Sequence, residues 1–411
     1  MDITHLIFLV VYLAMGLGHI PGFKVDRTGA ALIGGIAMIV AGSLTPEKAW
    51  NSIDYRTIGM LFGLMVVSAA FVVSGFYAFV AHWVATLPVK PPALLAILVV
   101  VAGFLSSLLT NDVVVVAMTP LLVQISLARG LNPIPFLLAF CFAANTGAAG
   151  TIIGSPQNMI AAQALHLSFL EFLKTAGIPA LLSLPIVWSI VAFLYRGRWH
   201  LAGAGRSVSD APAPVVTVNR WETVKAALVT LGVVAAFTLT DWPRSLVALA
   251  AAGLLLLNRR IASSDMMKHV DGNLLLMLMG LFIVNAALAA TGTPQQLLAG
   301  LRAEGLDTHA PVWLFVITSI LCNLVGNNPA VMLLVPYLDP VSDANAIGAA
   351  LALGTGFSCN LILFGSLAGI IVVEEARVRG VRISFAEFAR SGVPVALACM
   401  ALAVAWLLLI S

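Results

Sequence analysis

Charged residues are scarce in this chain of 411 residues: Asp, Glu, Lys and Arg make up 9% of it, and hydrophobic residues make up 61%. Soluble domains carry about 25% charged residues. Because the apolar excess extends along the whole chain, the composition excludes a soluble enzyme, a nucleic-acid binder and a disordered regulator. Alternation of apolar and polar residues is also missing, as in the run LLAILVVVAGFLSSLL at 94–109, which excludes a membrane β-barrel. The chain is therefore predicted to be an all-α polytopic membrane protein.

Groupings of Cys and His are missing as well. The four cysteines lie in apolar stretches with no CxxC pattern and no His nearby, so neither a disulfide frame nor a zinc site is expected. No nucleophile and base fall at catalytic spacing within a span, and we expect neither an enzyme nor a cofactor. The first segment has no basic flank before it, so it is interpreted as a membrane helix rather than a cleaved signal.

The chain contains two copies of one unit. Matching residues lie 217 positions apart (Arg27 and Arg244, Asp54 and Asp271, Gly63 and Gly280, Gly75 and Gly292) or 216 apart (Asn111 and Asn327, Pro120 and Pro336). We therefore predict a first repeat over 1–195, a linker over 196–220 and a second repeat over 221–411. Repeated apolar units that Gly, Pro and Asn interrupt at corresponding places are typical of secondary transporters.

Each copy is expected to hold five spanning helices. They are predicted near 5–20, 28–45, 57–80, 134–165 and 176–195, and near 222–240, 244–258, 271–292, 346–374 and 392–410. Two segments remain, 92–122 and 311–338, each with polar residues at its middle. Divided into two, such a segment falls short of the ~17–20 residues that each span needs. We therefore predict one re-entrant hairpin in each copy, with the polar residues at its tip.

An odd number of crossings gives the two copies opposite orientations. With the linker in the cytoplasm, 16 of the 21 Lys and Arg residues fall on the cytoplasmic side, where basic residues are enriched in membrane proteins. The sequence thus predicts two inverted-topology repeats in the inner membrane, with the linker in the cytoplasm and both termini outside.

Four polar clusters fall where hydrocarbon is expected. They are the hairpin tips at 110–112 and 326–329 and the middle of two long helices, at 145–158 and 360–366. Gly, Ser and Pro interrupt these helices, so each is predicted to be broken. Broken helices expose N–H and C=O groups that bind ions and polar solutes. The alternative is that Asn and Ser only join helices and that Gly only permits close packing. The symmetric placement of all four clusters favours two half-sites around one cavity.

Asp112 is the one ionic group predicted at the centre of the membrane. A carboxylate there costs about 2.5–3.5 kcal/mol, and such residues face cavities or carry protons. The alternative, a cap on a hairpin helix, is compatible with a proton site. Asp54 and Asp271 follow polar loops and are predicted to be helix caps. Cys322 and Cys359 flank the second tip and the second broken helix; thiolates would suit a soft ion such as trivalent arsenic, or these residues are simply small apolar ones.

At these clusters the sequence resembles the ion transporter superfamily, which includes arsenite permeases, sodium/proton antiporters and sodium-dependent dicarboxylate or sulfate carriers. The segments that carry the resemblance are NDVVVVAMTP (111–120), NTGAAGTIIGSPQN (145–158), NNPAVMLLVP (327–336) and NLILFGSLAG (360–369). The resemblance implies a transport domain that moves against a scaffold in an elevator motion. Its expected partners are the lipid bilayer, a small ion as substrate, and a proton or sodium ion as coupling ion. A homodimer and a cytoplasmic ATPase are further candidates.

By this resemblance a set of polar residues and glycines would line the substrate and ion site. They are Thr110, Asn111, Asp112, Asn145, Thr151, Gly154, Ser155, Asn158, Asn327, Asn328, Asn360, Gly365 and Ser366. The chain departs from the relatives at Gly369, where they often repeat an Asn, and at both hairpin tips, where the carboxylate branch has Ser-Asn-Thr. These departures argue against sodium–dicarboxylate symport.

Proton-coupled efflux of arsenite or antimonite is the first functional hypothesis. A neutral weak acid needs only hydrogen bonds, whereas a dianion would meet Asp112 with no Lys or Arg in any predicted cavity wall. The alternatives are a sodium-coupled symporter of a dicarboxylate or inorganic anion and a sodium/proton antiporter. A receptor or assembly subunit without transport would have no cavity between the repeats.

Overall fold

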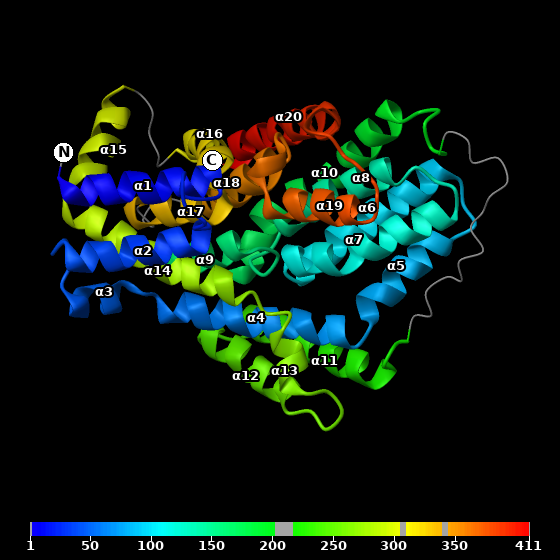
Figure 1. Cartoon of the computed structure of the whole chain (residues 1–411), viewed down its shortest axis with the longest axis horizontal. Coiled ribbons are helices and arrows are strands. Elements are labelled where there is room, and N and C mark those ends of the chain that lie inside the picture. The colour runs from blue at the N-terminus through cyan, green and yellow to red at the C-terminus, as the bar shows by residue number, and fades with distance from the viewer. Residues whose placement is uncertain (1, 202–216, 305–309, 339–343, 411) are drawn as a thin grey trace.

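A computed structural model describes residues 2–201, 217–304, 310–338 and 344–410, and within them the regular elements are all helical (Figure 1). The elements of the first half are α1 (Ile3–Leu17), α2 (Arg27–Val40), α3 (Pro46–Ser52), α4 (Tyr55–Val73), α5 (Phe76–Thr86), α6 (Pro91–Leu108), α7 (Asn111–Ala128), α8 (Pro133–Ala148), α9 (Pro156–Ala164) and α10 (Phe169–Leu194). Those of the second half are α11 (Arg220–Leu239), α12 (Arg244–Leu256), α13 (Ser263–Met267), α14 (Gly272–Ala290), α15 (Thr293–Ala303), α16 (Pro311–Val325), α17 (Asn327–Leu334), η1 (Val335–Tyr337), α18 (Ala344–Ser358), η2 (Leu363–Gly365), α19 (Leu367–Val378) and α20 (Phe385–Ile410).

Seven of the described helices are long and apolar enough to cross a membrane: α4, α6, α7, α10, α11, α14 and α20. Six further apolar helices are 10–17 residues long. Large apolar side chains such as Leu13, Leu231 and Leu409 are exposed on the outer helices. A surface of this kind is stable in lipid and costly in water. The chain is a multi-pass membrane protein of helical type.

The two long helices predicted over 57–80 and 271–292 each end earlier than expected. Glycine is the reason, because Gly75 and Gly292 adopt φ of 78° and 74°, which suits glycine and ends an α-helix. The chain then continues as α5 and α15, both of 11 residues and 217 positions apart. The short helices α3 and α13, which were not predicted, also begin 217 positions apart.

The predicted hairpins are present as helix pairs, α6 with α7 and α16 with α17. In the first pair both helices have 18 residues, so the argument that these helices are too short to span a membrane is wrong there. It erred because Pro120 lies inside α7 instead of ending it. The second pair is shorter, with 15 and 8 residues, and Pro336 falls in the 3₁₀ turn η1.

Both long helices predicted to be broken are broken in the structure. The first divides into α8 and α9 around 149–155, and the second into α18 and α19 around 359–366. Long helices of 26 residues, α10 and α20, follow the two broken helices at positions 216 residues apart. They begin seven residues earlier than the predicted starts at 176 and 392.

Helices α2, α4, α12 and α14 pack in crossed pairs, α4 on α12 and α14 on α2. A Cβ added to Gly63 would lie 2.4 Å from the carbonyl oxygen of Ala248, and one added to Gly280 would lie 2.5 Å from that of Ala31. Glycine is therefore required at both crossings. The two contacts exchange under the 217-residue offset, because Ala31 and Ala248 are themselves 217 positions apart.

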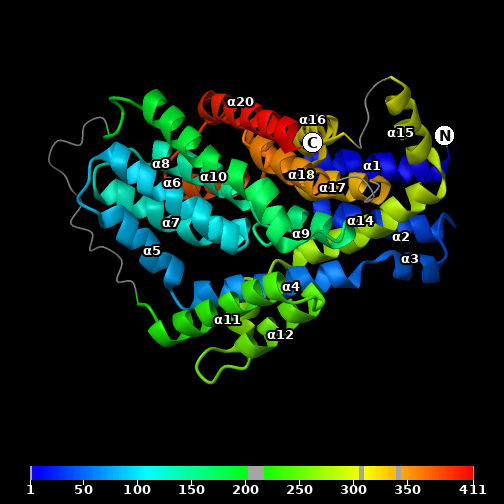
Figure 2. The ribbon, with the colours of Figure 1, turned by 180° about the vertical axis from the view of Figure 1, so that it is seen from behind.

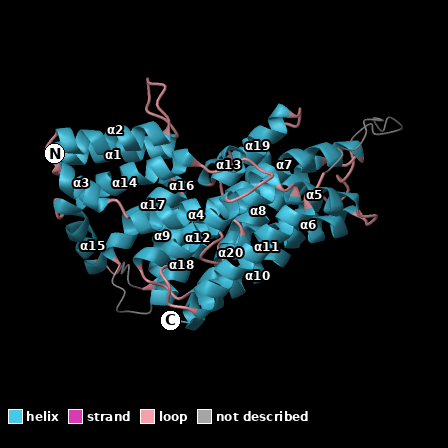
Figure 3. Ribbon diagram, turned by 90° about the horizontal axis from the view of Figure 1, so that it is seen from below, coloured by secondary structure: helices cyan, strands magenta, loops and turns pink. Residues whose placement is uncertain are grey.

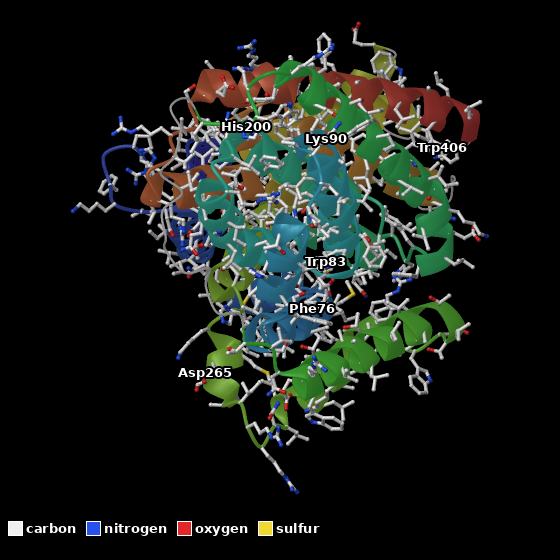
Figure 4. The ribbon with its side chains drawn as sticks, turned by 90° about the vertical axis from the view of Figure 1, so that its right-hand side faces the viewer. Phe76, Trp83, Lys90, His200, Asp265 and Trp406 are labelled. Atoms are coloured by element: carbon white, nitrogen blue, oxygen red, sulfur yellow. The ribbon has the colours of Figure 1, made fainter. Side chains whose placement is uncertain are left out.

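A second group contains α6 to α10 and α16 to α20, and in it α6 packs on α8, α16 on α18, and α10 on α20. Figures 2 and 3 show this group beside α4, α11 and α12. Seen along the long axis, Phe76 and Trp83 of α5 lie between this group and the α11–α13 segment (Figure 4). Contacts of α4 with α7 and α9, and of α14 with α17, join the two groups. The polar clusters lie where they meet.

Of the predicted linker, 202–216 lies outside the described residues. Its flanks are held by backbone hydrogen bonds, from the N–H of Leu201 to the carbonyl of Gly130 and from the N–H of Asn219 to the carbonyl of Ser74. Asn219 then begins α11, since its side chain accepts a hydrogen bond from the N–H of Glu222.

Candidate binding cavity

A cavity of about 190 Å³ lies between the two groups of helices. Seven of the thirteen predicted site residues line it: Asn111, Asp112, Asn145, Asn327, Asn328, Gly365 and Ser366. They come from both hairpins and both broken helices, so segments some 216 residues apart in sequence meet at one place. The predicted convergence of the four polar clusters is thus present in the structure, while their role in binding stays a prediction.

Asn145, on α8, connects three of the clusters. Its amide nitrogen is 2.9 Å from Oδ1 of Asn360 and 3.0 Å from Oγ of Ser366, and it donates to both. Its Oδ1 accepts a hydrogen bond of 3.4 Å from the amide of Asn111. All four side chains are buried, and hydrogen bonds in a dry interior fix side-chain positions strongly. The network holds the first hairpin tip and both broken helices in register.

Asp112 lies in the first turn of α7, and its carboxylate is on the cavity wall. It is half-buried, and no hydrogen bond or ion pair to it is found among the described residues. The backbone N–H of the neighbouring Asn111 donates to the carbonyl of Gly154 at 3.0 Å, which ties the hairpin tip to the break between α8 and α9. The N-terminus of α7 favours negative charge here. The carboxylate is therefore left available to a ligand or a proton.

The cavity wall is rich in unused hydrogen-bond acceptors. The amide oxygens of Asn111, Asn327 and Asn328 are buried and have no hydrogen-bond partner in the described parts of the chain. Gly326, whose φ is 94°, turns the chain sharply between α16 and α17, and Asn327 and Asn328 follow it directly. A buried oxygen without a partner costs about 1–3 kcal/mol. A ligand that brings O–H donors or positive charge would remove this cost.

The other predicted site residues have structural contacts instead of lining the cavity. Thr110 Oγ1 is 2.8 Å from Oγ of Ser68 on α4, and the hydroxyl of Thr151 donates to the carbonyl of Ser107. Asn158 donates to the carbonyls of Ala148 and Thr151, which holds the break in shape.

Two more predicted residues, Gly154 and Ser155, lie in the break itself. At Gly154 the backbone passes so close to Ala148 that a Cβ would lie 2.3 Å from its carbonyl oxygen. The hydroxyl of Ser155 is buried without a partner among the described residues. At Gly369, where the resemblance implies an Asn, a side chain would be tightly confined, because the carbonyl of Leu363 and the ring of Phe388 lie within 3.4 Å of where its Cβ would be.

Five lining residues with polar or charged side chains were not predicted: Arg27, Thr28, Gln157, Asp271 and Asn273. The expectation that no Lys or Arg lines the cavity is wrong, since Arg27 does so; the start of α2 reaches the cavity, although its sequence reads as a loop. Asp271 is a helix cap as predicted, accepting a hydrogen bond of 3.0 Å from the N–H of Leu274, and it lines the cavity as well. The correspondence of Arg27 with Arg244 in the two repeats was the sequence signal that could have marked Arg27 as a candidate site residue. Gln157 lies inside the GSPQN segment.

The cysteines do not form a metal site in the described residues, where no group of three Cys, His, Asp or Glu side chains could hold an ion. All four are buried free thiols. Cys322 Sγ is 3.0 Å from Oγ of Ser358, and the thiol of Cys359 donates to the carbonyl of Gly356. These contacts favour the interpretation of Cys322 and Cys359 as small helix residues.

The sequence pattern of the citrate transporter family matches this chain over residues 10–356. The chain belongs to this family. It is 28% identical to a 46 kDa membrane protein of Mycobacterium leprae over 97% of this chain and 96% of that one. Over 43% of this chain and 36% of the relative, it is 32% identical to the silicon efflux transporter of rice.

The crystal structure of the YdaH transporter of Alcanivorax borkumensis has the same fold. It matches with a TM-score of 0.60 at 15% identity, covering 98% of this chain and 95% of that one. The chain is thus a membrane transporter by family, as the resemblance to ion transporters implied. The family takes its name from a carboxylate, although the departures at the hairpin tips argued against the carboxylate branch.

Proposed function

We propose that this citrate transporter family member is a secondary active transporter built from two inverted repeats, 1–195 and 221–411, joined by a cytoplasmic linker over 196–220. The repeated element bounds and the exchanged contacts at Gly63 and Gly280 support the symmetry. The two groups of helices would act as a scaffold and as a moving transport domain. The excess of basic residues on the linker side supports an inner-membrane orientation with both termini outside.

The substrate proposed is a small, uncharged, hydroxyl-bearing weak acid, with arsenous acid as the first candidate. The observation that carries this proposal is the row of unpaired amide oxygens on Asn111, Asn327 and Asn328. Arsenous acid brings O–H donors, which satisfy such oxygens without any charge. A cavity of about 190 Å³ has room for a solute of this size. The rice relative is named as a silicon efflux transporter, and a hydroxylated solute is consistent with that name.

Asp112 would carry the coupling proton. With Arg27 charged and Asp271 ionised, the cavity wall is neutral when Asp112 is protonated and carries one negative charge when it is not. Each charge moved across 100 mV contributes about 2.3 kcal/mol, roughly a 50-fold gradient. An inward-moving proton on Asp112 would therefore drive efflux of a neutral solute.

Citrate or a related anion is the second candidate, and the family match favours it. A multiply charged anion would meet one cation, Arg27, and two carboxylates, Asp112 and Asp271, on the cavity wall. It would therefore need compensating cations, for which the free amide oxygens are suitable ligands. A sodium-coupled symporter, one of the alternatives from the sequence, would meet this need.

The test is transport by the purified chain in sealed liposomes. Under the first proposal, an imposed pH gradient drives accumulation of arsenite without sodium, and Asp112→Asn abolishes the dependence on the gradient. Citrate accumulation that requires a cation and ignores the pH gradient would support the second candidate and contradict the first. Proton-driven transport that survives in Asp112→Asn would show that another group carries the proton. Arg56→Ala, on the surface away from the cavity, is the matched control.

A further inference from the structure

Arg244, at the start of α12, holds the end of the first broken helix. Its guanidinium donates to the carbonyl of Ala162 at 3.5 Å and to that of Leu167. These carbonyls belong to the C-terminus of α9, where His166 adopts φ of 51° and the N–H of Leu167 bonds to Ala162. Helix C-termini bind cations through such free carbonyls. One group of helices is thus fastened to the other at this end.

The second broken helix ends in the same geometry. Gly380 has φ of 80°, and the N–H of Val381 bonds to the carbonyl of Ala376, as Leu167 does to Ala162. The arginine equivalent to Arg244 is Arg27, 217 positions earlier. Arg27, however, donates through Nε to the carbonyl of Met15 at 2.9 Å, and its Nη atoms have no partner among the described residues. It lines the open cavity instead.

We propose that Arg27 and Arg244 are alternating latches of the transport cycle. In the present state Arg244 is engaged with the end of α9, and the cavity is open beside Arg27. In the alternative state Arg244 releases α9 and Arg27 binds the carbonyls at the end of α19, near Ala376 and Val381. This inference rests on the proposed transport function and adds the two residues that stabilise its end states.

The two latches are unequal because the end of α19 carries an excess of positive charge, whereas the charges around the end of α9 are balanced. Around Gly380, Glu374 pairs with Arg377 and Glu375 with Arg379, and Arg382 adds a further positive charge. Arg27 would approach an excess of one positive charge there. In the groove at the end of α9, Arg244 is accompanied by Arg56, Asp241 and His166, and the opposite charges of Arg56 and Asp241 offset each other. The present state, with Arg244 engaged, is therefore the favoured one without substrate.

The experiment measures how accessible an introduced cysteine is on each side of the protein when one of the arginines is removed. Thr28→Cys reports on the open cavity, and Ser245→Cys, 217 positions later, reports on the closed side, where Ser245 is buried. The four native cysteines are buried and give little background. The full chain is labelled with a membrane-impermeant maleimide in sealed vesicles of both orientations, so that the reagent reaches each reporter from its own side, and the rates are measured without substrate.

Arg27→Ala should slow labelling of Ser245→Cys about tenfold or more, since a lost hydrogen bond to a charged group shifts an equilibrium by that factor. Arg244→Ala should speed labelling of Ser245→Cys by a similar factor, because it destabilises the favoured state in which Ser245 is buried. Arg56→Ala, which lines the same groove as Arg244 without a hydrogen bond to α9, should leave both rates unchanged. Size-exclusion profiles identify any variant that fails to fold.

Unchanged rates in folded Arg27→Ala and Arg244→Ala would overturn the latch proposal, and so would changes of the opposite sign. Because the labelling needs no substrate, this result does not depend on the transport assay. Shifted rates in a chain that transports neither arsenite nor citrate would support the latches and contradict the proposed substrates.

Discussion

Asn145 of the first broken helix donates a hydrogen bond of 2.9 Å to Asn360 of the second. The two residues open the two polar breaks and lie 215 positions apart in the sequence, so near-equivalent positions of the two halves meet each other directly. Each is almost completely buried, with 3% and 0% of its surface exposed. The cavity is therefore built around a contact between the halves rather than inside either one.

Removing this contact should destabilise the protein and disable the site. Asn145→Ala removes the donor to Oδ1 of Asn360 and one of the two donors to Oγ of Ser366, and we expect it to lower the free energy of unfolding by about 1–3 kcal/mol and to abolish transport. Thermal or denaturant unfolding in detergent measures the loss. Combined with Asn360→Ala the loss should be less than additive, whereas with the distant Asn219→Ala it should be additive. Additive losses for both pairs would contradict a direct coupling.

Much of this arrangement could be predicted from the sequence. The two polar hairpin tips and the two broken helices follow from Gly, Pro and Asn in long apolar runs, because few interruptions of a membrane helix are tolerated. The breaks at Gly75 and Gly292 were missed because a single glycine does not show whether it adopts a positive φ or packs within a straight helix.

The candidate site was predicted only in part, and the residues that were missed have a different cause. Residues inside the polar clusters, such as Asn145 and Asp112, reach the cavity, while Arg27 and Asp271 come from helix starts that sequence patterns place in loops. The sequence also could not predict the direction of a side chain within a cluster. Asn158 lies in the same segment as Asn145, but its side chain donates to backbone carbonyls of that segment instead of facing the cavity. Such positions depend on tertiary packing, which adds to the local pattern.

The glycines at the two helix crossings should not tolerate alanine. Gly63→Ala and Gly280→Ala would place a methyl group against the backbone of Ala248 and Ala31, and each should cost about 1–3 kcal/mol of stability. Gly253→Ala on α12 is the matched control, because its Cβ would meet nothing within 4 Å. The measurement is the unfolding midpoint of each variant in detergent. Equal stability of Gly63→Ala and Gly253→Ala would show that the crossing can open without cost.

The two aspartates that cap α4 and α14 should separate stability from transport. Asp54 accepts from the N–H of Arg56, and Asp271 accepts from the N–H of Leu274, both at 3.0 Å. Loss of either cap should cost about 1 kcal/mol. Only Asp271 lines the cavity, so Asp271→Ala should also reduce transport, and Asp54→Ala should not. Unfolding and liposome uptake are measured on the same preparations, and an equal loss of transport in both would contradict a role for Asp271 in the cavity.

The hydroxyl of Thr110 should act as an anchor of the hairpin tip and not as a contact to the substrate. It lies 2.8 Å from Oγ of Ser68, and the backbone N–H of Thr110 bonds to the same oxygen at 3.2 Å. Thr110→Val removes one of these hydrogen bonds and Ser68→Ala removes both, so Ser68→Ala should reduce transport at least as much as Thr110→Val. The double variant should be no worse than Ser68→Ala alone, because no further link between α4 and the tip is lost.

Thr110→Ser keeps the hydroxyl and should retain transport. The kinetic constants of uptake for these four variants decide between the two roles. An anchor supports the position of Asn111 and Asp112, so its loss should appear whether Ser68 or Thr110 is changed. If Thr110→Val raises the apparent KM far more than Ser68→Ala does, the hydroxyl of Thr110 contacts the substrate directly in another state of the cycle.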